Sequence, residues 1–110
     1  MSASGRFTVR LSTDAADDIE RLYDFLIARE LARPGGGDFL WAERAREIVL
    51  DALRALETTP FTCRKVGNSS FSRELVISHG ATGYVALFEI LDSQTVLVTA
   101  VRHQREDGYH

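Results

Sequence analysis

Two apolar strands near the C-terminus, between Tyr84 and Arg105, constrain the fold of this chain more than any other stretch. Residues 84–90 and 96–101 are rich in β-branched and aromatic side chains, and the turn residues Asp92-Ser93-Gln94 separate them. Apolar residues occupy both faces of these strands, so both faces need cover from elsewhere in the protein. The first half of the chain is the only helical material available. The sequence therefore predicts a small antiparallel sheet with helices packed on it.

The first half of the chain is typical of one strand followed by two helices. Residues 7–11 alternate apolar and polar side chains, which indicates a strand at or near the edge of the sheet. A helix with an apolar stripe follows and ends at about Ala32. Three glycines at 35–37 break it, and Asp38 is a suitable N-cap for a second helix, Phe39 to Leu56. The two helices are expected to form an antiparallel hairpin.

Shorter strands are predicted after the helices, over residues 62–66 and 71–78, ahead of the two C-terminal strands. The expected fold is α+β in the order β-α-α-β-β-β(-β), with a mainly antiparallel C-terminal sheet of three to four strands. At 110 residues the chain is expected to be one domain, with residues 1–5 as a flexible tail.

Charge and cysteine content narrow the function classes. The net charge is −3, with twelve arginines and one lysine, which argues against a general nucleic-acid binder. No apolar run is long enough to span a bilayer, so no membrane partner is expected. A single cysteine, Cys63, fits a reducing cytoplasm.

Catalytic chemistry could sit where cations leave the strands. Arg73 opens one strand with its guanidinium expected to be free, and Arg102 and His103 close the last strand. If both strands run antiparallel to the same central strand, these residues and Tyr109 would converge at one end of the sheet. Such a cluster suits RNA cleavage, with arginine stabilising phosphoryl charge and histidine or tyrosine moving protons. It equally suits a carboxylate-rich protein partner. No metal site or cofactor is predicted, because His79, His103, His110 and Cys63 lack ligand spacing.

The helix end Leu56-Glu57-Thr58-Thr59-Pro60, the strand Arg73-Glu74-Leu75-Val76-Ile77 and the ending Val101-Arg102-His103-Gln104-Arg105-Glu106 together resemble the ParE/RelE superfamily. These proteins are the toxins of bacterial type II toxin–antitoxin systems. The resemblance runs from about Phe7 to Tyr109, and its ending is more similar to ParE than to RelE.

The resemblance implies one of two activities. A ParE-like toxin would inhibit DNA gyrase by trapping its cleaved-DNA complex, with no catalytic residues and with Arg73, Arg102, His103 and Arg105 binding the target. A RelE-like toxin would be a metal-independent, ribosome-dependent mRNA endonuclease with Arg73, Arg102, His103 and Tyr109 as catalytic groups. RelE-type members are strongly basic, whereas this chain is acidic, so the ParE-like activity is the expectation.

The resemblance also implies a cognate antitoxin and a toxin–antitoxin heterotetramer or larger complex. Phe39, Leu40 and Trp41 begin the second helix and are more apolar than one buried stripe requires. They are the predicted antitoxin-binding residues, on which an amphipathic helix of the antitoxin would lie while a further segment adds a strand to the sheet.

Overall fold

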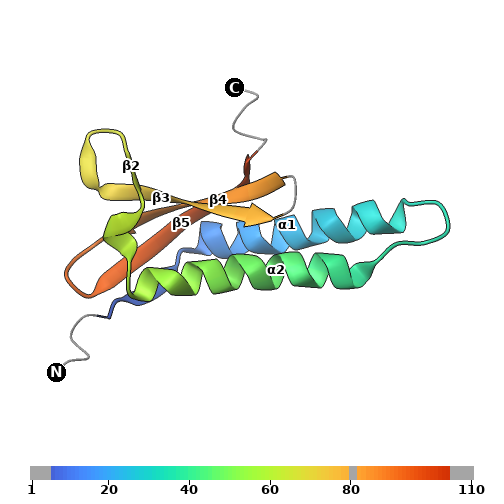
Figure 1. Cartoon of the computed structure of the whole chain (residues 1–110), viewed down its shortest axis with the longest axis horizontal. Helices are drawn as coiled ribbons and strands as arrows, with labels where there is room; N and C mark the ends of the chain where they lie inside the picture. The colour runs from blue at the N-terminus through green and yellow to red at the C-terminus, as the bar shows by residue number, and fades with distance from the viewer. Residues whose placement is uncertain (1–5, 80–81, 105–110) are drawn as a thin grey trace.

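Two long helices and a five-stranded sheet make up the protein, as the computed structural model shows for residues 6–79 and 82–104 (Figure 1). The predicted α+β fold, with its helical hairpin ahead of the C-terminal strands, is confirmed. The elements follow in the order β1 (Thr8–Leu11), α1 (Thr13–Leu31), α2 (Phe39–Arg54), two 3-10 turns (Ala55–Glu57 and Pro60–Thr62), β2 (Arg64–Val66), β3 (Ser69–His79), β4 (Thr82–Ile90) and β5 (Thr95–His103).

The strands lie in the order β1-β5-β4-β3-β2. β2 to β5 pair in antiparallel fashion, whereas β1 runs parallel to β5 with Val9 opposite Val96. The first strand of the chain therefore joins the last one at the edge of the sheet, which confirms its predicted edge position.

Side-chain caps define where both helices begin. The Ser12 hydroxyl accepts a hydrogen bond from the Ala15 amide at 3.0 Å, and an Asp38 carboxylate oxygen accepts one from the Leu40 amide at 3.0 Å. Between the helices, Gly35 and Gly36 have φ values of 81° and 90°, which are unfavourable for other residues. The predicted glycine turn and the predicted cap at Asp38 are confirmed.

The end of α2 differs from the prediction in detail. Regular α-helix stops at Arg54, and the chain continues as two 3-10 turns before β2 begins at Arg64 rather than at Thr62. Pro60 is buried and starts the second turn, because a proline cannot donate the hydrogen bond that would extend the helix.

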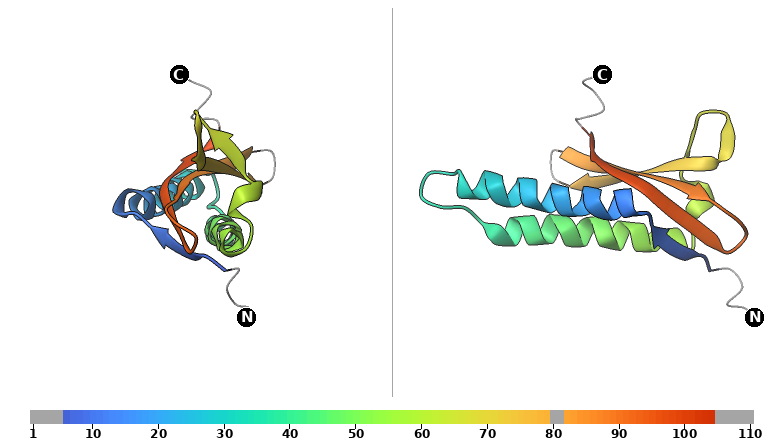
Figure 2. Two further views of the ribbon diagram at one scale, coloured as in Figure 1. Left: turned by 90° about the vertical axis from the view of Figure 1, so that its left-hand side faces the viewer. Right: turned by 180° about the vertical axis from the view of Figure 1, so that it is seen from behind.

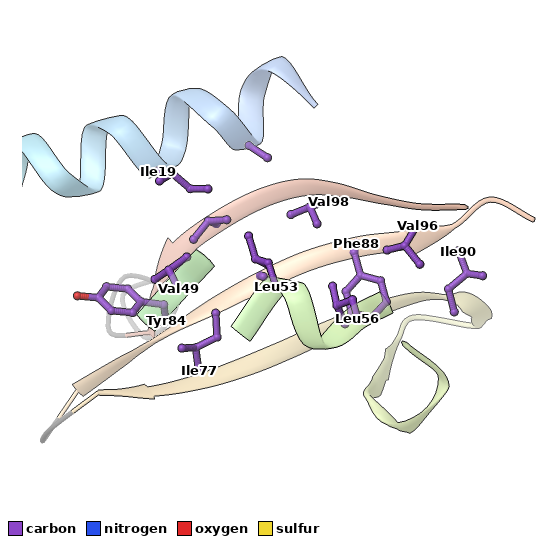
Figure 3. Packing of buried hydrophobic residues seen from close by; sticks show 13 residues of the cluster. Ile19, Val49, Leu53, Leu56, Ile77, Tyr84, Phe88, Ile90, Val96 and Val98 are labelled. Carbon is purple, nitrogen blue, oxygen red and sulfur yellow. The ribbon is translucent and has the colours of Figure 1, made fainter. Parts of the chain in front are cut away.

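The helices cover one face of the sheet only (Figure 2). The core between these two layers combines α1, α2 and the inner face of the strands, with Tyr84 at one end of the cluster and its hydroxyl pointing away from the other side chains (Figure 3). Leu11, which the alternating pattern places inward with Phe7 and Val9, is instead 41% exposed, because β1 ends there and the chain turns into the cap of α1.

The helical hairpin is longer than the sheet that it covers (Figure 1). The C-terminal part of α1 and the N-terminal part of α2 extend past the ends of β3 and β4, and we call the loop and helix ends at residues 31–41 the tip. In the described residues, no helix is long and apolar enough to cross a membrane.

Candidate functional site

The predicted convergence of Arg73 and Arg102 at one end of the sheet is wrong. β3 and β5 are both antiparallel to β4, but Arg73 lies opposite Phe88 near the start of β3 whereas Arg102 lies opposite Val85 at the end of β5. The positions of Phe88 and Val85 are about 10 Å apart along β4. Phe88 points into the core and Val85 does not, so the two arginines also lie on opposite faces of the sheet.

Arg73 is buried, with 8% of its surface exposed, so the prediction of a free guanidinium is also wrong. Its Nε donates to the Ser70 carbonyl at 2.8 Å, and its Nη1 donates to the Phe61 and Cys63 carbonyls, both at 2.8 Å. The guanidinium also lies 5.2 Å from the centre of the Phe61 ring. Arg73 therefore ties the second 3-10 turn and the start of β2 to the start of β3.

His103 lies in a row of rings that no pattern in the sequence indicates. Its ring centre is 5.5 Å from that of Tyr84, Tyr84 is 6.3 Å from His79, and His79 is 4.9 Å from Trp41. The pairing of Tyr84 with both Ile77 and His103 places the ends of β3 and β5 beside it. Only this strand register could have revealed the row.

Tyr84 at the centre of the row is 1% exposed, and burial raises the pKa of its hydroxyl. The phenol therefore keeps its proton at neutral pH. The row joins β3, β4, β5 and α2 through ring contacts, which gives it a packing role whatever else His103 does.

Arg102 is exposed on the face of the sheet that the helices leave bare. In the described ranges 6–79 and 82–104 it takes part in no ion pair. The described residues do not include the predicted site residues Arg105 and Tyr109. They also do not include the tail 1–5 and the centre of the β3–β4 turn at 80–81.

The bare face of the sheet also carries carboxylates. Glu74 forms an ion pair with Arg64 across β2 and β3, and Glu89 is exposed on β4. Val76, 41% exposed, adds an apolar side chain between them and the end of β3. This mixture of charges is poorly suited to holding a polyphosphate backbone, which needs a basic surface.

The predicted antitoxin-binding residues lie at the tip and are all exposed: Phe39 by 44%, Leu40 by 76% and Trp41 by 40%. They do not form one surface, because successive helix residues point about 100° apart. Trp41 leans toward the sheet and meets His79, whereas Leu40 points away into solvent. Their role stays a prediction.

The outer edge of β3 is covered along part of its length. β2 pairs with β3 only as far as Glu74, opposite Arg64, so the stretch Leu75–His79 has no strand beside it on that edge within the described part of the chain. Alternate residues of such a stretch direct their amide and carbonyl groups outward.

No group of three or more histidine, cysteine, aspartate or glutamate residues is placed to hold a metal ion within the described ranges. The Cys63 thiol is half-buried, and burial raises its pKa, so it is a poor nucleophile at neutral pH.

Residues 9–108 match the family model described as "ParE toxin of type II toxin-antitoxin system, parDE". The chain belongs to this ParE toxin family. A solved structure titled "Chromosomal ParDE TA system from P. aeruginosa" is similar in fold, with a TM-score of 0.68, 14% sequence identity, and coverage of 90% of this chain and 97% of the other. A search of curated proteins returned no match. The resemblance to ParE-type toxins inferred from the sequence is confirmed.

Proposed function

We propose that this ParE-family toxin acts in the cytoplasm on DNA gyrase, and that it traps the enzyme's cleaved-DNA complex rather than cleaving RNA itself. The state of Arg73 is the main support. A RelE-like site needs this arginine at the scissile phosphate, but here three backbone carbonyls of the toxin already occupy its guanidinium. Moving it to a substrate would leave these partly buried carbonyl groups without their donor.

The charges on the bare face of the sheet also favour a protein target over an RNA target. Glu74 and Glu89 lie on this face, and Arg102 is an exposed cation of this face at the end of β5. An exposed arginine can bind a carboxylate of a protein partner through two parallel hydrogen bonds. Arg102 is therefore the target-contact residue that we propose first, with His103 and Arg105 beside it in the sequence.

The first test combines antitoxin-free toxin with purified gyrase, supercoiled plasmid and ATP, and measures linear DNA after detergent and protease treatment. We expect linear DNA only when gyrase is present. Arg102→Glu should lower its yield by about tenfold or more, because the contact becomes repulsive.

Arg10→Glu is the matched control, since Arg10 is also exposed on a strand but lies opposite Leu97, about 16 Å from Arg102 along β5. It should leave the yield within about twofold of the original toxin, as expected for a charge outside the contact. If no linear DNA forms and translated mRNA is cut on ribosomes instead, the RelE-like activity is correct and the gyrase proposal is wrong.

We propose further that a cognate antitoxin neutralises the toxin by binding at the tip and at the open edge of β3. Leu40 is exposed and apolar, and the stretch Leu75–His79 can accept an added strand. Leu40→Asp should weaken antitoxin binding by about 100-fold, as loss of a buried apolar contact in an interface does. The binding constant can be measured by calorimetry.

Phe71→Asp is the control for this substitution. Phe71 is 55% exposed at the start of β3, outside the tip, so the same chemical change there should leave the affinity nearly unchanged. Equal effects of the two substitutions would contradict docking at the tip. Light scattering of the mixed proteins would test the expected heterotetramer or larger assembly.

A further inference from the structure

The helical hairpin passes beyond the end of the sheet (Figure 1). A hollow lies in this part of the hairpin, beside Trp41, whose ring meets that of His79 in β3. Its volume is about 230 Å³, and its lining combines charged and apolar side chains from both helices and the loop between them: Leu26, Arg29, Glu30, Arg33, Asp38 and Trp41. The gyrase and antitoxin contacts proposed above do not use this hollow.

The two carboxylates of the hollow are already engaged within the toxin. Glu30 is 7% exposed, and its Oε1 accepts hydrogen bonds from the Asp38 amide at 2.7 Å and from Arg33 Nη1 at 3.2 Å. The bond from the Asp38 amide is the main reason that the pKa of Glu30 is lowered. The Asp38 carboxylate in turn caps α2 at the Leu40 amide.

The loop backbone beside Glu30 is tightly packed. A Cβ at Gly37 would overlap the Glu30 carbonyl oxygen, so the loop packs directly against α1 at this point. The negative charges of the hollow are thus turned toward the loop backbone and Arg33 rather than toward a ligand.

Arg29 is the cation of the hollow that forms no ion pair within residues 6–79 and 82–104, although its charge helps to lower the pKa of Glu30. Its guanidinium lies 5.8 Å from the centre of the exposed Phe25 ring. It is also close enough to the Tyr84 hydroxyl to oppose the rise in that group's pKa. The apolar side chains of Leu26 and Trp41 form the walls beside it.

We propose that this hollow binds one acidic side chain of the antitoxin, with the carboxylate on Arg29 and a neighbouring apolar residue against Trp41 and Leu26. An unpaired arginine beside apolar walls suits this ligand, because guanidinium binds carboxylate through two parallel hydrogen bonds and partial burial strengthens them. The inference rests on antitoxin docking at the tip and adds the chemistry of the segment that docks there.

The test measures the affinity of the cognate antitoxin for toxin variants by calorimetry at low and high salt. Arg29→Ala should weaken binding by about tenfold or more at low salt, and by less at high salt, where the charged contact is screened. Arg29→Lys keeps the charge but not the planar fork of donors. Its affinity for the antitoxin should therefore lie between those of the original toxin and of Arg29→Ala.

Arg10→Ala is the matched control, because Arg10 is an exposed arginine of β1, away from the tip, that takes part in no ion pair in the described ranges. It should change the affinity by less than about twofold, as a surface substitution outside the contact does. Each aspartate and glutamate of the antitoxin is then replaced by its amide in combination with Arg29→Ala. One position should lose its effect in that background, since the two residues share one interaction.

The outcomes separate this inference from the docking proposal on which it rests. If Leu40→Asp weakens binding but Arg29→Ala does not, or no antitoxin carboxylate is coupled to Arg29, the antitoxin docks at the tip and the carboxylate site is wrong. If Leu40→Asp has no effect either, docking at the tip itself is wrong.

Discussion

Both ends of this molecule hold an irregular segment in place with one buried charged side chain, and the two side chains have opposite charge. At the β2 end, Arg73 donates to the carbonyls of Phe61, Cys63 and Ser70. At the tip, Glu30 accepts from the amide of Asp38. Arginine stays charged at every pH at which proteins fold, whereas a carboxylate can be protonated. The bonds made by Arg73 at the β2 end therefore do not weaken in acid, whereas those accepted by Glu30 at the tip can.

The largest effect is expected from removing the charged group of the β2 end. Arg73→Ala leaves three carbonyl groups without their donor and should lower the free energy of unfolding by about 3 kcal/mol. Urea unfolding followed by circular dichroism measures the change. Arg73→Lys should recover part of it, because one ammonium group can reach some of the three acceptors.

If Arg73→Ala unfolded at the same urea concentration as the original protein and lost only toxicity, Arg73 would be a contact residue and not a structural one. Amide hydrogen exchange should locate the loss at residues 60–72, with the tip unchanged.

A smaller effect is expected from removing the cap that Glu30 helps to position. Asp38→Ala removes the acceptor of the Leu40 amide and should lower stability by about 1 kcal/mol. Hydrogen exchange should rise at the tip and first turn of α2 while the β2 end stays protected. Faster exchange at both ends would show that the two ends are not independent.

The smallest effect at neutral pH, and the most specific one, is expected from Glu30→Gln. The amide oxygen can still accept from Asp38, so only the charge is lost. In the original protein the pKa of Glu30 is below its ordinary value of 4.5, so its contribution to stability is complete above that value and is lost as the pH falls through the lower, folded-state pKa.

Hydrogen exchange at the tip should therefore rise in acid in the original protein but change much less with pH in Glu30→Gln. Arg29, Arg33 and Asp38 are the other charged groups around this site, and they are the same in both proteins. Identical pH profiles for the two proteins would contradict the role of Glu30.

The sequence predicted the layers of this fold well, because they depend on local patterns. β1 itself, although Leu11 departs from its alternation, the apolar stripes of the helices, the glycines of the loop and the Asp38 cap are confirmed where predicted. Each of these signals comes from residues within a few positions of one another, so no knowledge of strand pairing was needed.

The candidate site could not be predicted from the same signals, because it depends on register. Arg73 and Arg102 both end up beside β4, but three residues apart and on opposite faces. The sequence around an arginine in an apolar strand does not indicate whether its guanidinium binds a phosphate or backbone carbonyl groups of the same protein. Arg29 was missed because it looks like any helix-surface cation until the overhang of the hairpin places it beside Trp41.

The parallel pairing of β1 with β5 has a consequence for how the toxin is made. Ser12, directly after β1, bonds the carbonyl of Thr99 in the last strand, so contacts near the start of the chain need a partner 87 residues further on. Synthesis must therefore have passed β5 before β1 can join the sheet. β1 is thus made first but cannot be paired until β5, the last strand of the sheet, has been made.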